Sequence, residues 1–265
     1  MQRQRSRSGF TLLELLVVVA ILAVLGGAML VSYDGLEEDA ASAHAGFNIA
    51  ATDRAVRTYK SLNRQFSDEW DSLLTDDGGG TFAFLDRLND DLVARIKIQT
   101  VTAAEVTALN NIGVSVVRDI DNSAGNYDND NDFTNDNVTL PNRLFDDNAG
   151  GSGFYGQTRT VAATESVATV DDATTLGTLL GLVATDKVVA LGLGNNNTIT
   201  DQSKDGAVSQ IPFGAVQQGE YGRFIALFQV TEAGTTLNEA RFIGVIDGKG
   251  NVLDEDIADF TEGKN

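Results

Sequence analysis

The sequence predicts an α+β protein, in which one long N-terminal helix packs on an antiparallel β-sheet. Three observations lead to this prediction. A helical pattern runs from residue 10 to about residue 62, and no proline occurs before residue 141. Short segments of mixed character follow, and strand-like segments dominate after residue 187. A helix followed by a run of strands is the order typical of α+β proteins.

Composition limits the class of protein before any motif is considered. The chain has 265 residues and 42% hydrophobic residues, which is enough for a real core. It has no cysteine, so no disulfide can stabilise an exported domain. The formal net charge of −19 at pH 7 repels phosphate groups and anionic membranes at long range. We therefore expect no nucleic acid among the partners.

The N-terminus combines a basic segment, residues 1–9, with a long apolar segment that starts at Phe10. Residues 10–31 contain a single charged residue, Glu14. As a helix they would cross the ~30 Å hydrocarbon core of a bilayer at 1.5 Å per residue. Arginines before the apolar segment favour a cytoplasmic N-terminus and export of the remainder. We expect a transmembrane and assembly helix at residues 10–33.

Glu14 separates this segment from two simpler alternatives, an ordinary secretory signal peptide and a plain single-pass anchor. An acidic residue inside a spanning helix costs ~2.5–3.5 kcal/mol and is normally paired and functional. The apolar stretch offers Glu14 no basic partner of its own. Cleavage between Gly9 and Phe10 would create a new α-amine, and the amine of a neighbouring subunit could pair with Glu14. Neither alternative gives a reason for this carboxylate.

Residues 9–17 resemble the prepilin cleavage and methylation motif of type IV pilins and type II secretion pseudopilins; they read Gly-Phe-Thr-Leu-Leu-Glu-Leu-Leu-Val. The resemblance covers about the first 25 residues. It implies that residues 1–9 are a leader, that a prepilin peptidase cuts after Gly9 and that the same enzyme N-methylates Phe10. Glu14 is then the fifth residue of the mature chain, at the position that guides assembly. The resemblance also implies a pilin-like fold.

The same resemblance implies partners and a location. The partners would be prepilin peptidase, other pilin or pseudopilin subunits, an inner-membrane assembly platform and membrane lipid. The chain would cross the bacterial inner membrane once, with its N-terminus in the cytoplasm. Its C-terminal domain would lie in the periplasm, or outside the cell in a filament.

Residues 34–64 are expected to continue the helix as an amphipathic segment that packs on the protein's own sheet. An apolar stripe recurs at spacings of three or four along it. The stripe consists of Leu36, Ala40, Ala43, Phe47, Ala51, Ala55 and Tyr59. Acidic residues cluster at 34–39 and basic residues at 54–64, about 30 Å apart on a helix. The two clusters could pair between staggered subunits, or they could simply be solvated, with the cations favoured near the helix C-terminus.

Residues 65–265 are predicted to form the exported α+β domain. We expect helices at 82–96 and 103–111, with a short strand at 114–117. Further strands are expected at 187–193, 221–231 and 240–246. Residues 242–253 resemble a hairpin that closes through Asp247-Gly248-Lys249-Gly250-Asn251. Residues 119–137 and 146–153 are rich in Asp, Asn and Gly and are predicted to be loops.

The first of these loops is a candidate calcium site. Alternate residues Asp128, Asp130 and Asp132 supply the hard carboxylate oxygens that Ca²⁺ prefers. The EF-hand pattern is not met, because Phe133 and Thr139 stand where that pattern requires Gly and Glu. Some pseudopilins with a similar N-terminus hold a loop with calcium. The alternative is a solvated loop without a cation.

No pattern of residues predicts an enzyme. The single histidine, His44, lies on the long helix, and the absence of cysteine excludes thiol catalysis. We expect a structural subunit of a type IV pilus-like filament or of a type II secretion pseudopilus. The lack of the cysteine pair that many adhesive pilins carry favours the pseudopilin. The alternatives are a membrane-anchored binding domain that never polymerises and a DNA-uptake pilin, which the acidic charge disfavours.

Overall fold

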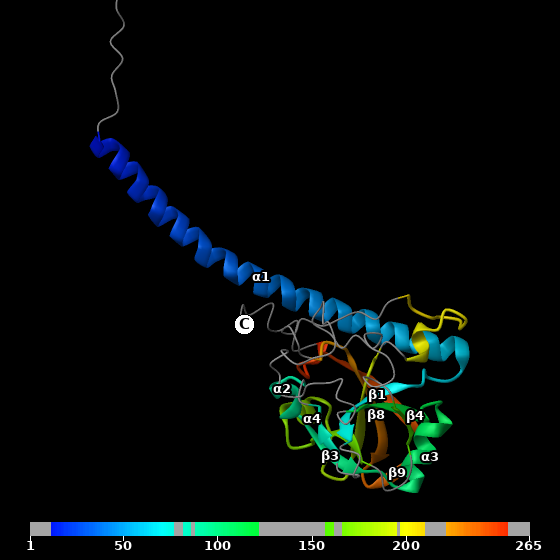
Figure 1. Cartoon of the computed structure of the whole chain (residues 1–265). Helices are drawn as coiled ribbons and strands as arrows, with labels where there is room; N and C mark the ends of the chain where they lie inside the picture. Colours follow the sequence, from blue (N-terminus) through cyan, green and yellow to red (C-terminus); the bar gives the residue numbers. More distant parts are fainter. Residues whose placement is uncertain are drawn as a thin grey trace, which may run out of the picture.

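The computed structural model describes residues 12–76, 82–85, 88–121, 157–161, 166–194, 197–209 and 221–253. A helix of 52 residues, α1 (Leu12–Asn63), dominates the shape. Its N-terminal half projects away from the rest of the protein, and its C-terminal half lies along a domain built around a sheet (Figure 1). The continuous helix predicted from Phe10 to about Leu62 is therefore present over the described residues. It runs without interruption through Gly26 and Gly27.

The buried face of α1 differs in part from the predicted stripe. The residues of this helix that enter the core are Ile49, Val56 and Tyr59, with Thr52 buried between them. The predicted stripe placed Phe47 on this face, but its side chain is 72% exposed. Ile49 and Val56 are seven residues apart, so they share a helix face that Phe47 does not. The amphipathic pattern was recognised, but one of its members was assigned to the wrong face.

Within the described residues, nine strands form one sheet beside α1. They are β1 (Trp70–Asp76), β2 (Phe82–Phe84), β3 (Ile96–Thr100), β4 (Val116–Asp121), β5 (Gln157–Thr160), β6 (Ser166–Val170), β7 (Lys187–Gly192), β8 (Ile225–Glu232) and β9 (Thr235–Ile246). The strand order across the sheet is β3-β6-β7-β1-β4-β5. Outside this order, β2 pairs with β1, β8 pairs with β7, and β9 pairs with β8. Strand β9 contacts the C-terminal half of α1.

The pairing is antiparallel among the described strands, except that β1 runs parallel to β4. The predicted antiparallel sheet is therefore correct for most of the domain. The short turn at Ala233–Gly234 joins β8 to β9, and both residues have positive φ. Such backbone is typical of tight hairpin turns. Strands predicted near 187–193, 221–231 and 240–246 correspond to β7, β8 and β9.

Strands β6, β7 and β8 are buried on both faces, which explains their continuous apolar runs. Alternate side chains enter two separate cores, because successive residues of a strand point to opposite faces. Val189 and Phe228 pack on the side of α1 and α3. Val188 and Leu227 pack on the other side, with α2 and α4. These helices are α2 (Asp90–Val93), α3 (Ala103–Asn111) and α4 (Thr175–Leu179), and a short 3₁₀ turn covers Thr198–Thr200.

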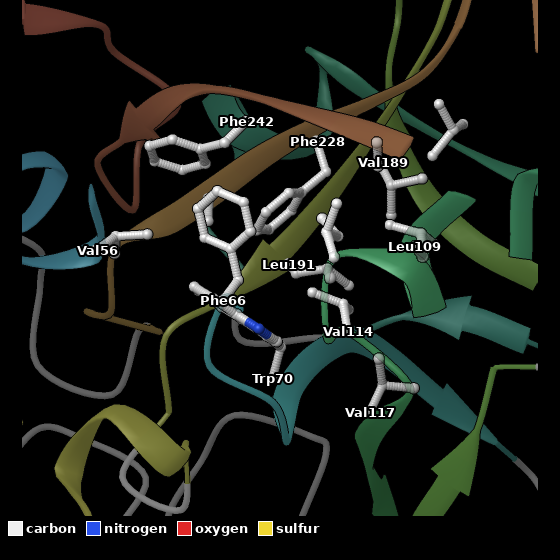
Figure 2. Packing of buried hydrophobic residues seen from close by; sticks show 14 of the residues in the cluster. Val56, Phe66, Trp70, Leu109, Val114, Val117, Val189, Leu191, Phe228 and Phe242 are labelled. Atoms are coloured by element: carbon white, nitrogen blue, oxygen red, sulfur yellow. The ribbon is translucent and has the colours of Figure 1, made fainter. Parts of the chain in front are cut away.

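Aromatic rings from β1, β8, β9 and the segment that follows α1 pack together in the first core. Phe228 makes an edge-to-face contact with Phe66 at 5.3 Å and another with Trp70 at 5.5 Å between ring centroids. Phe242 lies 5.4 Å from Phe66, and Val56 of α1 adjoins the same group (Figure 2). Such pairs contribute ~0.5–1.5 kcal/mol each beyond the area that they bury. They hold the segment that follows α1 against the sheet.

Two sequence predictions for this domain were wrong in part. Residues 82–96 were expected to form one helix, but Phe82–Phe84 pairs antiparallel with β1, and Ile96 already belongs to β3. Among the described residues of this range, only the four residues of α2 are helical. Of the hairpin expected at 242–253, the closing turn through Asp247–Asn251 is present, but within the described residues no strand returns after β9. The carboxylate of Asp247 accepts the backbone N–H groups of Lys249 and Asn251 in this turn.

The helix predicted at 103–111 is α3, and its start shows why. Thr102 and Glu105 form a capping box, with each side chain accepting the other residue's backbone N–H. Glu105 is buried and also accepts hydrogen bonds from Lys187 of β7 and Thr231 of β8. The ionised carboxylate thus connects α3 to two strands.

Two glycines near the end of β7 make room for a second buried polar contact. The hydroxyl of Tyr221 donates to the carboxylate of Asp71 in β1 at 2.5 Å. A Cβ at Gly192 would overlap the Tyr221 hydroxyl, and one at Gly194 would overlap the Asp71 carboxylate. Any larger residue at either position would therefore push this pair apart.

Candidate assembly surface

Of the predicted site residues, Glu14 is the one that lies within the described part of the chain. Gly9, Phe10 and the three predicted calcium ligands Asp128, Asp130 and Asp132 lie outside the described residues, so their roles stay predictions. Glu14 lies in the first turn of α1, which begins at Leu12. The structure therefore places the predicted assembly residue on a helix that continues directly into the domain.

The start of α1 presents apolar side chains to its surroundings on every side. Residues 15–23 are all exposed, and the large apolar side chains among them and at Leu12 are 45–82% exposed. Consecutive residues of a helix lie about 100° apart, so this run leaves no polar face. A helix that is apolar all round is normally buried in another protein or in lipid. Within the described part of the chain, no helix combines the length and apolar character required to cross a membrane.

A second apolar contact point lies farther along α1 at Phe47. This ring is exposed, whereas Ile49, two residues later, is only 2% exposed. Phe47 was predicted to be a core residue and not a surface residue, because its spacing from Ala51 and Ala55 is that of one helix face. The stronger signal was the seven-residue spacing of Ile49 and Val56, which are larger and more apolar than alanine.

The predicted basic cluster consists of Arg54, Arg57 and Lys60 at the C-terminal end of α1 and Arg64 just beyond it, and all four residues are exposed. Two of them are also tied to the domain by aromatic rings. The Lys60 ammonium lies 4.5 Å from the Phe66 ring centroid. The Arg57 guanidinium carbon lies 4.8 Å from the ring centroid of Phe242 in β9. Arg241 of β9 extends the basic surface and pairs with Glu232 at 2.9 Å.

Arg57 also anchors α1 to the last strand of the sheet through hydrogen bonds. Its Nε donates to Asp53 at 2.7 Å, one turn earlier in α1. Its Nη2 donates to the carbonyl oxygen of Ile243 at 3.2 Å. That carbonyl belongs to β9, whose only strand partner among the described residues is β8. Arg57 thus covers part of an edge that could otherwise pair with another chain.

A groove of about 730 Å³ lies between α1 and β9. Its apolar wall consists of Ile49, Leu62, Leu180, Leu227, Ile243, Val245, Ile246, Val252 and Leu253. Asp53, Arg54 and Arg57 of α1 line it as well. The groove could not be predicted from the sequence, since its walls come from four separate parts of the chain.

The turn after β9 positions one end of this groove. Burial raises the pKa of Asp247 above its usual range, although hydrogen bonds from the backbone of Asn251 and Lys249 oppose the shift. Arg95 stabilises the same turn, because its Nη1 donates to the carbonyl of Gly250 at 2.8 Å. The chain leaves this turn toward Val252 and Leu253, both of which line the groove.

Among the described residues, no group of three or more His, Cys, Asp or Glu side chains lies close enough to hold a metal ion. What the surface offers is an apolar helix start, an exposed ring at Phe47, a basic helix end and an adjacent groove. These features suit contacts with other chains.

Comparison with known proteins identifies the N-terminal segment. Residues 4–30 match the family model of the prokaryotic N-terminal methylation motif. No curated protein matches the chain. No solved structure matches it. The matched residues contain Gly9, Phe10 and Glu14 and extend into the exposed apolar part of α1. The chain thus carries the prokaryotic N-terminal methylation motif, the prepilin motif of type IV pilins and pseudopilins, which implies processing by prepilin peptidase and assembly with other pilin subunits.

Proposed function

We propose that this protein is a non-enzymatic structural subunit of a type IV pilus-like filament or of a type II secretion pseudopilus. The observation that carries the proposal is the methylation motif at residues 4–30, which runs directly into a helix with an exposed apolar surface. Prepilin peptidase removes residues 1–9 and methylates Phe10. The mature chain then polymerises through the first half of α1.

Two features of the described structure support an assembling subunit. The apolar start of α1 is not covered by the chain's own domain, so it requires another apolar surface. Phe47 extends the exposed apolar contacts beyond residue 23. In this proposal the helix start is held in the inner membrane before assembly and by neighbouring helices afterwards. An assembly platform in that membrane drives the transfer of the helix start from the membrane into the filament.

The proposed processing can be tested by intact mass spectrometry of the membrane-extracted protein. We expect a mass that corresponds to a chain starting at Phe10 with one added methyl group. A chain that keeps Met1 or Gln2, or one cut near Ala28, would indicate a plain anchor or ordinary secretion. Either result would contradict the proposal.

The role of Glu14 separates an assembling subunit from a membrane-anchored binding domain. In the Glu14→Leu variant we expect normal cleavage after Gly9 but no incorporation into filaments, because the neighbour's α-amine loses its carboxylate. Glu38→Leu is the matched control, since it removes an acidic residue from the same helix outside the motif. An anchor that never polymerises would show no difference between the two variants.

The choice of pseudopilin over true pilin is also a proposal. The absence of cysteine favours the pseudopilin, because many adhesive pilins carry a cysteine pair. Deleting the gene and measuring secretion of exported enzymes tests this choice. A pseudopilin is required for secretion, whereas loss of a true pilin leaves secretion intact and removes surface filaments.

A further inference from the structure

A second hollow adjoins the groove between α1 and β9. It has a volume of about 460 Å³ and shares Arg57 and Ser61 of α1 with the groove. Residues 239–242 of β9 line this hollow, and residues 243–246 of the same strand line the groove. The groove and the hollow therefore form one continuous surface along α1 and β9, which we call the docking surface.

The docking surface is basic, although the chain has a formal net charge of −19. Its charged residues are four cations and two carboxylates, namely Arg54, Arg57, Lys60, Arg241, Asp53 and Glu239. Arg57 pairs with Asp53 at 2.7 Å, and Arg241 pairs with Glu232 at 2.9 Å. Arg54 and Lys60 make no ion pair with a carboxylate among the described residues. The domain thus leaves two cations of this surface available to a carboxylate of another chain.

Exposed apolar side chains continue the same face of α1 in both directions. Phe47, Arg54 and Thr58 are seven and four residues apart, so they share one face of the helix. Phe47 is 72% exposed, one turn before the groove begins. Leu62 lines the other end of the groove and is 55% exposed. An occupant that covered this face would bury apolar surface beside the two cations.

Charge complementarity points to a second copy of this chain as the occupant. Copies that each carry this negative charge repel one another, unless the surfaces that meet have opposite charge. The docking surface is positive, and the remainder of the chain is acidic. A contact between a basic surface and a different, acidic surface is heterologous. Heterologous contacts that do not close into a ring generate open filaments.

We propose that the docking surface binds an acidic surface of a second copy of this chain. Carboxylates of the neighbour pair with Arg54 and Lys60, and apolar side chains beside them cover Phe47 and the wall of the groove. The proposal rests on the proposed function, because it names a contact between subunits of one assembly. This contact joins the domains of neighbouring subunits, in addition to the contact through the start of α1.

Site-specific photo-cross-linking of the full chain, in the cells that produce it, tests this contact. The cross-linker p-benzoylphenylalanine replaces Thr58, which is exposed and lines the groove. The control carries it at Thr107, which is exposed on α3 and lines neither the groove nor the hollow. The two positions are matched, because each hydroxyl donates to the carbonyl oxygen four residues earlier in its helix. We expect roughly tenfold more product with the mass of two chains from Thr58, since a bound neighbour is held at high local concentration.

Charge reversal tests the role of the cations. Arg54→Glu should lower the yield of this dimer about tenfold, because an attractive charge contact becomes a repulsive one. Lys204→Glu is the control, since Lys204 is exposed and lines neither the groove nor the hollow. Peptide sequencing of the dimer should place the second attachment point in an acidic part of the neighbouring copy. Equal dimer yields from Thr58 and Thr107, equal effects of the two charge reversals, or a product with a different protein would overturn the proposal.

Failure of this contact can be distinguished from failure of the proposed function. Intact mass spectrometry of the same preparation shows whether the chain begins at a methylated Phe10, and isolation of filaments shows whether it polymerises. A chain that is processed and polymerises, but gives no excess of dimer at Thr58, would overturn the docking surface alone. In a chain that is not processed, an excess of dimer that depends on Arg54 would still support the contact between copies.

Discussion

The guanidinium of Arg57 in α1 lies over the ring of Phe242 in β9, with 4.8 Å between the guanidinium carbon and the ring centroid. The same guanidinium donates to the carbonyl oxygen of Ile243. One side chain therefore holds the end of the long helix against the exposed edge of the sheet.

Replacing Arg57 by Met should lower the melting temperature, because Ile243 loses a donor and Phe242 loses its cation. The side chain is 53% exposed, so its cation–π contact is worth only ~0.5–1 kcal/mol. Arg64→Met is the control, since it removes the same charge from an exposed position past the end of α1. Thermal unfolding of both variants checks this prediction. Equal melting temperatures for the two variants would contradict it.

Phe47 and Ile49 should have opposite roles although they are two residues apart. Phe47→Ala should leave unfolding almost unchanged, because the ring is exposed, but it should reduce incorporation into filaments. Ile49→Ala should destabilise the domain by ~2–5 kcal/mol, the usual cost of truncating a buried isoleucine. Chemical denaturation measures the first property and filament yield the second. Normal filament yield with Phe47→Ala would show that this ring is not an assembly contact.

The ion pair between Glu105 and Lys187 should make stability depend on pH. Burial raises the pKa of Glu105, but hydrogen bonds from Lys187, Thr102 and Thr231 outweigh it, so the pKa lies below its usual range. A carboxyl group whose pKa is lowered by folding stabilises the folded protein at pH values above its ordinary pKa. This stabilisation is lost as the pH falls through the lowered pKa. Glu105→Gln should therefore destabilise the protein at pH 7.

The loss in free energy of unfolding caused by Glu105→Gln should become smaller as the pH falls below the lowered pKa, because the natural glutamate is then protonated and uncharged as well. The measurement is denaturant unfolding at a series of pH values. Glu239→Gln is the control, because that carboxylate is exposed on β9. A loss in free energy of unfolding that stays constant down to acidic pH would show that the charge of the Glu105 carboxylate does not stabilise the protein.

Calcium binding remains a prediction about Asp128, Asp130 and Asp132. Titration calorimetry with Ca²⁺ should show binding, and a chelator should lower the melting temperature of the protein. Asp130→Asn should weaken binding, because it removes one of the three charged ligands that attract the cation. No heat of binding, together with a melting temperature unchanged by chelator, would favour the alternative of a solvated loop.

Several features could be predicted because they depend on residues close together in the chain. The apolar run after Phe10, its single carboxylate and the basic leader define the methylation motif locally. The continuous helix of α1 follows from an uninterrupted pattern without proline, and α3 follows from its apolar spacing. The runs in β7 and β8 indicated buried strands for the same reason.

Other features could not be predicted, since they depend on which distant segments meet. Periodicity showed that α1 is amphipathic, but only packing against β9 decided that Ile49 and not Phe47 is covered. Pairing with β1 overrode the helical pattern at Phe82–Phe84.

The sequence alone determined that this protein starts with a prepilin motif and a long helix followed by a sheet. Only the tertiary structure decided the parallel pairing of β1 with β4 and the groove beside α1. The physical reason is that a local pattern specifies the period of an element and its apolar side. The identity of the surface that covers that side is set by long-range packing, to which residues from the whole chain contribute.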